Sequence, residues 1–213
     1  FLLAHQRLPP EPGKTWCTVP ALIHRLMGDI PSRPAYVLNL RWDVLAWNAA
    51  ADRVFGFSAL PADRRNLLWM LFTSSTMHEL FNPWDEQALQ ILSSFRRDFV
   101  RATQDPDITA LVKDLEKASP DFREWWRQQD IHGPCQGIRH LKIDSVGQVV
   151  FEHTTLTIDE DRHLRLVDDR HGEDRARRAV VGDGERAAAE VSWLQLVVAC
   201  TVSQVDDLSG DLR

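Results

Sequence analysis

The chain has 213 residues, of which 44% are hydrophobic and 26% charged, and its formal net charge is -6 at pH 7. This composition is ordinary for a globular protein, and the length suits one large domain or one domain with appendages. The acidic balance argues against direct nucleic-acid binding by this piece, because contacts to phosphates need a basic surface.

The first residues predict a domain boundary. Phe1–Arg7 has the character of the end of a preceding helix, and the Pro-Pro-Glu-Pro-Gly run at 9–13 predicts a linker because proline cannot continue a helix. We expect residues 1–13 to end a preceding domain, residues 14–167 to form the main domain, and residues 168–213 to form a charged tail. A short amphipathic helix is predicted over 19–27.

Residues 34–57 are the most informative stretch of the chain. The apolar runs at 36–40 and 44–47 favour two strands joined by a tight turn. Asn48 is a good N-cap for a short alanine-rich helix, which Gly56 ends. Two strands leading into a small helix resemble the start of a PAS-type sensor domain, a fold that holds small molecules between a sheet and helices.

Several helices are predicted next. Residues 67–72 favour a buried helix, and Asn82-Pro83 marks the start of a longer one with Asn82 as its cap. Apolar residues then recur every three or four positions, at Trp84, Ala88, Ile91, Phe95, Phe99 and Ala102. Asp105-Pro106 and Ser119-Pro120 predict the starts of two further helices.

The segment after Gly133 is rich in β-branched residues. Residues 138–143, 148–158 and 163–167 predict three antiparallel strands in a meander. The resulting fold class is α+β and PAS-like: a five-stranded antiparallel sheet with helices packed on one side. Residues 168–190 are highly charged, so we expect them to be exposed or disordered.

Known catalytic motifs are absent from the sequence. It holds no phosphate-binding loop, dinucleotide fingerprint, nucleophile elbow or His-Glu-x-x-His motif, so we expect no cofactor and no enzyme activity. His132, Cys135 and His140 fall close together, but their spacing matches no standard zinc module, and no metal site is expected.

Cysteine usage and hydropathy bear on the compartment. The odd number of widely spaced cysteines argues against a disulfide framework and for a reducing cytoplasm. No apolar run approaches the roughly 18 residues of a membrane span, so we expect a cytoplasmic protein with no membrane partner.

Four segments carry a resemblance to a known family. They are Ala-Trp-Asn at 46–48, Arg-Asn-Leu at 65–67, Leu-Phe at 71–72, and Leu-Glu-Lys-Ala-Ser-Pro-Asp-Phe-Arg-Glu-Trp-Trp at 115–126. In this order they resemble the MmyB-like ligand-binding domain of XRE-type helix-turn-helix transcription regulators, which are abundant in actinomycetes. The likeness runs from about Pro20 to Val167.

The resemblance implies a PAS-like domain of a cytoplasmic regulator. It implies a fatty acid or a similar apolar small molecule as the ligand, and a homodimer as the assembly. DNA would be contacted only through an N-terminal helix-turn-helix domain, of which residues 1–13 would be the end and the linker.

The candidate ligand-binding residues combine these motif positions with aromatic residues of the predicted pocket. Arg65 or Asn66 could meet an acidic head group, because a guanidinium can hold a carboxylate with two hydrogen bonds. The full predicted set is Trp47, Asn48, Phe55, Arg65, Asn66, Phe72, Trp84, Phe95, Phe122 and Trp125.

Two other functions stay open at this point. The aromatic residues could form a solid core, which would make the domain a ligand-free dimerisation module of the regulator. A small α+β enzyme is the third possibility, although no acid–base or nucleophile set converges in the sequence. The ligand-sensing function is the first hypothesis: an acyl chain gains about 0.8 kcal/mol per buried methylene, so an aromatic tunnel could bind a fatty acid well. The volume of a cavity would separate this function from the dimerisation module.

Overall fold

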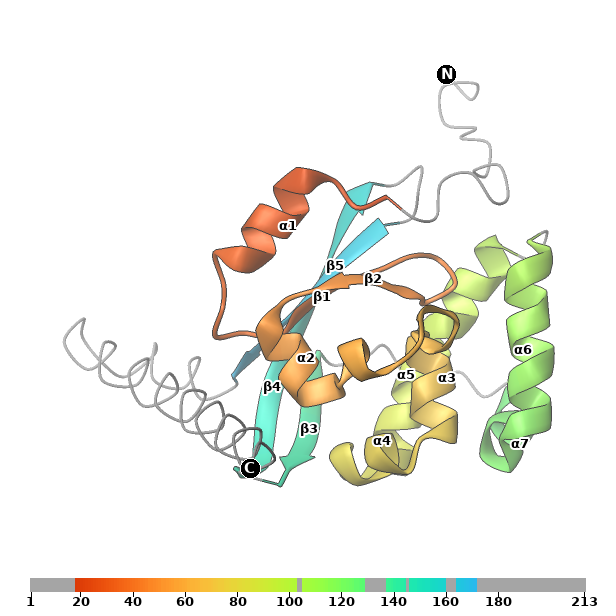
Figure 1. The fold of residues 1–213 in the computed structure, drawn as a ribbon. Helices are drawn as coiled ribbons and strands as arrows, with labels where there is room; N and C mark the ends of the chain where they lie inside the picture. The colour runs from red at the N-terminus through yellow and green to blue at the C-terminus, as the bar shows by residue number, and fades with distance from the viewer. Residues whose placement is uncertain (1–17, 103–104, 129–136, 145, 160–163, 172–213) are drawn as a thin grey trace, which may run out of the picture.

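The computed structural model describes residues 18–102, 105–128, 137–144, 146–159 and 164–171, which form one antiparallel sheet with helices on both faces (Figure 1). The sheet contains β1 (Ala35–Leu38), β2 (Val44–Trp47), β3 (Ile138–Ile143), β4 (Gly147–Asp159) and β5 (Leu164–His171). Their order is β2-β1-β5-β4-β3, and every neighbouring pair is antiparallel. The predicted α+β class with a five-stranded antiparallel sheet is confirmed, and the strand order is consistent with a PAS-like arrangement.

In the described parts of the chain, one helix precedes β1 and the other six follow β2 and precede β3. They are α1 (Ala21–Gly28), α2 (Ala49–Phe55), α3 (Leu67–Thr73), α4 (Ser75–Leu80), α5 (Trp84–Arg101), α6 (Pro106–Ala118) and α7 (Pro120–Gln128). Two 3-10 turns, Phe57–Ala59 and Ala62–Arg64, join α2 to α3.

Local capping explains where most of these helices begin. The Asn48 side chain accepts a hydrogen bond from the backbone N–H of Ala51, and Gly56 ends α2 with a φ of 67°. The predicted caps at Asp105 and Ser119 also form, through the backbone N–H groups of Asp107 and Phe122.

The predicted cap of α5 is wrong. The helix begins at Trp84, Pro83 occupies the N-cap position, and no side chain caps it. Asn82 is joined to Pro83 by a cis peptide bond and donates its backbone N–H to the carbonyl of His140 at 3.1 Å. The segment before α5 is therefore held against β3, where Phe81 pairs with Leu141.

Strand alternation produces two hydrophobic clusters, one on each face of the sheet. On β1, Tyr36 and Leu38 face the larger cluster, which α2–α7 complete. Ala35 and Val37 face the smaller cluster, which α1 covers. The expectation of helices on one side thus holds for α2–α7, whereas α1 lies on the opposite face, as Figure 1 shows.

The last strand is longer than the sequence predicted. β5 continues past Val167 to His171, into the charged stretch that was expected to be exposed or disordered. Its charges have partners: Asp168 pairs with Arg33 at 3.2 Å. Asp169, which is only 1% exposed, lies 2.9 Å from His153 Nδ1 and 3.8 Å from Arg139 Nε. Charged residues can therefore form part of a buried strand when their charges are paired, although composition alone would predict an exposed segment.

Across the parts of the chain that the structure describes, no helix is long and apolar enough to cross a membrane.

Candidate functional site

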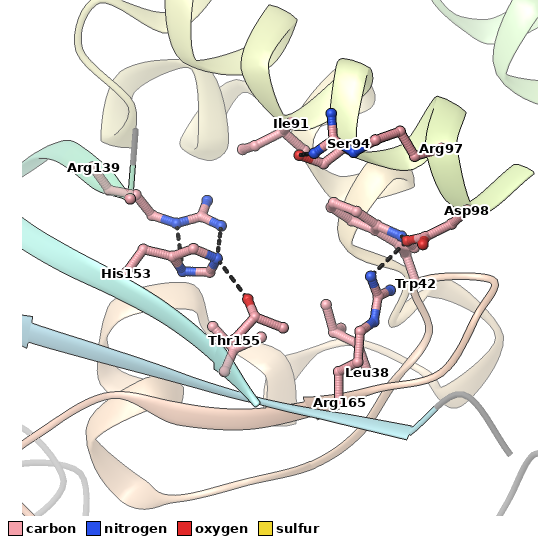
Figure 2. Close-up of a pocket in the computed structure, with 12 residues that line it drawn as sticks. Leu38, Trp42, Ile91, Ser94, Arg97, Asp98, Arg139, His153, Thr155 and Arg165 are labelled. Carbon is pink, nitrogen blue, oxygen red and sulfur yellow. Dashed lines mark hydrogen bonds and ion pairs between the residues drawn. The ribbon is translucent and has the colours of Figure 1, made fainter. Parts of the chain in front are cut away.

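A cavity of about 320 Å³ lies between α5 and the helix-facing side of the sheet. Its volume is at the lower end of the range that small-molecule sites occupy. Side chains from α5, from four strands and from the β1–β2 turn surround it (Figure 2). The lining residues are Leu38, Trp42, Ile91, Ser94, Arg97, Asp98, Gly137, Arg139, His153, Thr155, Arg165 and Val167.

One end of the cavity is a cluster of Arg165, Asp98 and Trp42. The Asp98 Oδ2 atom accepts hydrogen bonds from an Arg165 guanidinium nitrogen at 2.5 Å and from Trp42 Nε1 at 2.8 Å. The guanidinium carbon of Arg165 also lies over the Trp42 ring, 5.2 Å from its centroid. This cluster connects β5, α5 and the β1–β2 turn across the cavity.

Trp42 occupies an unusual backbone position in that turn. Its φ is 69°, a left-handed conformation that is strained for a bulky residue. The turn is held by Asn39, whose side chain exchanges two hydrogen bonds of 2.9 Å with Asp43. In this backbone conformation the buried indole of Trp42 forms part of the cavity wall, and its N–H is directed at Asp98.

The other end of the cavity is a cluster of Arg139, His153 and Asp169. His153 Nδ1 lies 2.9 Å from Asp169 Oδ1 and accepts from Arg139 Nε at 3.0 Å. Its Nε2 lies 3.1 Å from both Thr155 Oγ1 and a second Arg139 nitrogen. Burial lowers the pKa of His153, and the Arg139 charge lowers this pKa further, against the opposing effect of Asp169. Nδ1 is thus shared by two neighbours: it donates to Asp169 when it carries the ring proton, and it accepts from Arg139 Nε when it does not.

The charges around the cavity leave an excess of positive charge. Arg97, Arg139 and Arg165 line it together with one carboxylate, Asp98. Asp169 supplies a second carboxylate behind His153, so one guanidinium charge is not balanced by these two. Arg97 is exposed, and its hydrogen bond in the described structure goes to Ser94 Oγ at 2.9 Å. The cavity is therefore suited to an anionic ligand with an apolar body.

The described residues hold no group of three or more His, Cys, Asp or Glu side chains that could bind a metal ion. His132 and Cys135 lie outside the described residues.

Comparison with known families gives the context for this cavity. A family model of the MmyB-like transcription regulator ligand binding domain matches residues 19–181. The chain belongs to this family. No curated protein matches the chain. An MmyB-like ligand-binding domain is part of a transcription regulator, and the family implies a small-molecule ligand.

None of the ten predicted ligand-binding residues of this MmyB-like domain lines the cavity described above. Five of them stabilise the junction of β2, α2 and α3: Trp47, Asn48, Phe55, Arg65 and Asn66. The Arg65 Nε donates to the carbonyls of Phe57 and Leu60 at 3.0 and 2.7 Å, and its guanidinium stacks over Trp47. Asn66 caps α3 through the N–H of Trp69.

The other five predicted residues are aromatic and lie among the helices: Phe72, Trp84, Phe95, Phe122 and Trp125. Phe72 contacts the rings of Trp84, Phe122 and Trp125 at 5.1 to 5.9 Å between centroids. Phe95 approaches the cavity, since its ring meets that of Trp42 edge-on at 6.1 Å. Direct ligand contact by the ten residues stays a prediction.

The sequence reasoning missed the charged residues of the cavity, although a signal for them exists. Arg139 has the same strand parity as buried Leu141, and Arg165 has the same parity as buried Val167. Asp98 follows Ile91 and Phe95 on the apolar face of α5. A charged residue at a core-facing position must find a partner or a ligand, and this criterion would have selected these positions.

Proposed function

We propose that this domain senses a fatty acid or a similar anionic, apolar small molecule in the cavity between α5 and the sheet. The observation that carries the proposal is the cavity itself, with apolar walls from Leu38, Ile91 and Val167 and an excess of guanidinium groups. A chain of about ten methylenes would gain roughly 8 kcal/mol on burial, which exceeds the usual ordering cost of such a ligand.

The proposed output is transcription control by a cytoplasmic, homodimeric XRE-type regulator rather than catalysis. A ligand that prefers one packing of α5 against the sheet shifts the domain toward that packing, and an attached N-terminal helix-turn-helix domain responds. The family match to regulator ligand-binding domains supports this role. The coupling requires that the ligand bind the two packings with different affinities.

The first experiment is native mass spectrometry of the purified chain, followed by organic extraction and lipid analysis. The proposal predicts a bound carboxylic acid at about one per chain, or saturable binding of decanoic acid in calorimetry. A clean mass together with no binding across an acyl-chain series would favour the ligand-free dimerisation module.

A substitution that fills the cavity tests whether this is the site. Ile91 is 4% exposed and lines the cavity, so Ile91→Trp should reduce decanoic acid affinity at least about tenfold by occupying the space of several methylenes. Val100→Trp is the matched control, because Val100 lies on the same helix and is 72% exposed. Unchanged affinity in a folded Ile91→Trp variant, checked by circular dichroism, would place the ligand elsewhere.

A further inference from the structure

The Asp98 carboxylate lies in surroundings that bind carboxylates. An arginine N–H and the indole N–H of Trp42 converge on one oxygen, Oδ2, at 2.5 and 2.8 Å. Hydrogen bonds from a guanidinium to a carboxylate are among the strongest in proteins. Because Trp42, Asp98 and Arg165 all line the cavity, a ligand's carboxylate could reach the same two donors.

The two donors are held in place by contacts other than those with Asp98. A guanidinium nitrogen of Arg165 donates to the carbonyl of Asn39 at 3.2 Å, and the group stacks on Trp42. Arg165 Nε is buried and makes no hydrogen bond to the described residues, which leaves one further donor on the same group. The donor pair would therefore persist if the Asp98 side chain moved away.

Asp98 lies on a helix, whereas its two hydrogen-bond donors belong to the sheet and to the turn between two of its strands. Arg165 belongs to β5 and Trp42 to the β1–β2 turn, whereas Asp98 lies in the last turn of α5, which ends at Arg101. A carboxylate in the last turn of a helix is disfavoured by the helix dipole. The position of Asp98 is thus explained by its bond across the cavity and not by the stability of the helix.

We propose that Arg165 and Trp42 form a carboxylate subsite of the cavity, that Asp98 fills this subsite as an internal stand-in, and that the carboxylate of an acidic ligand displaces it. This inference rests on the proposed function, namely that the cavity binds an amphiphilic small molecule. An acidic ligand then breaks the ion pair between Asp98 on α5 and Arg165 on β5. A neutral ligand of equal length leaves this ion pair intact, so Asp98 makes the domain discriminate acids from neutral compounds.

The test compares decanoic acid with decan-1-ol by isothermal titration calorimetry on the full chain and on Asp98→Asn. Asparagine keeps an acceptor oxygen for Trp42 and Arg165 but removes the competing charge. We expect Asp98→Asn to bind decanoic acid about tenfold more tightly and decan-1-ol within about twofold of the unsubstituted chain. Asp114→Asn is the matched control, because Asp114 is on the exposed side of α6, is paired with Lys117 and is not a lining residue.

Weaker decanoic acid binding by Asp98→Asn, or an equal change for both compounds, would overturn the inference and show that Asp98 only positions Arg165. Failure of the unsubstituted chain to bind either compound would overturn the proposed function, and the inference with it. If Asp98→Asn does not fold, Trp42→Phe provides a second variant. It removes the indole donor, so it should weaken decanoic acid binding while decan-1-ol binding is retained; equal effects on both would again contradict the subsite.

Discussion

At the scale of single residues, the notable feature is how many charged side chains face the larger hydrophobic cluster. Arg139 and Asp169 are 5% and 1% exposed, and both belong to the network around His153. Burying a charge is costly unless it is paired and hydrogen-bonded. This network is therefore the most sensitive part of the site to changes in protonation.

His153 should make stability depend on pH. Its pKa in the folded chain is lowered from the ordinary 6.5. As pH falls below about 6.5, the unfolded chain binds a proton at this residue that the folded chain does not, so the free energy of unfolding decreases. We expect the melting temperature to be lower at pH 5.5 than at pH 7.5, and the difference to shrink in His153→Gln.

The control for this experiment is His24→Gln on the exposed side of α1, which should keep the full pH difference. Burial raises the pKa of Asp168, so this carboxylate acts in the opposite direction and becomes protonated more readily in the folded chain as pH falls. The decisive measurement is therefore the comparison of the two variants, rather than the pH dependence of the unsubstituted chain alone. An identical difference in melting temperature between pH 5.5 and pH 7.5 in both variants would contradict the assignment to His153.

At the scale of elements, α5 is attached to the sheet on both sides of the cavity. Near its start, the Gln87 amide donates to the His140 carbonyl at 2.5 Å and accepts from the His140 N–H at 3.0 Å. Near its end, Asp98 reaches Arg165 on β5. The first attachment satisfies backbone groups at the edge of β3, and the second crosses the cavity, so a ligand can release one without the other.

Gln87→Glu tests the attachment to β3. The substitution places a carboxylate oxygen against the His140 carbonyl and removes the donor, so we expect a loss of about 2 kcal/mol in the free energy of unfolding, measured by urea denaturation. Gln90→Glu, about one turn further along α5, should change stability by less than about 0.5 kcal/mol. Equal effects of the two substitutions would show that the Gln87 contact contributes little.

At the scale of the whole molecule, the two hydrophobic clusters share β1 as a common wall. Tyr36 and Leu38 belong to one cluster, and Ala35 and Val37 to the other. Loss of packing on one face therefore weakens the strand on which the other face also depends. We expect α1 and the helices of the larger cluster to unfold together in one cooperative transition.

Met27→Ala tests this cooperativity from the smaller cluster. Met27 is 2% exposed, so its truncation should cost about 2–5 kcal/mol and lower a single melting transition seen alike by tryptophan fluorescence and far-ultraviolet circular dichroism. Leu26→Ala, with Leu26 at 43% exposure on the same helix, should cost much less. Separate transitions for the two signals would mean that α1 detaches independently.

Features that depend on near neighbours in the chain were determined by the sequence itself. The caps at Asn48, Asp105 and Ser119 and the strand at 138–143 follow from the chemistry of a few adjacent residues. The four family motifs are likewise read from the sequence, and they lie within residues 19–181, which the family model matches. The failed cap at Asn82 shows the limit, because its backbone is engaged by β3, which lies far along the chain.

The tertiary structure alone decided the face covered by α1, the length of β5 and the composition of the cavity. Asp98 and Arg165 are 67 positions apart, and Arg139 and His153 are brought side by side by the pairing of β3 with β4. Secondary-structure propensity and hydrophobic periodicity depend on a few neighbouring residues. Burial of a charged side chain depends on which residue, distant in the sequence, the fold places next to it. The aromatic motifs were therefore visible from the sequence, but the charged pairs that line the cavity became visible only when the sheet brought their elements together.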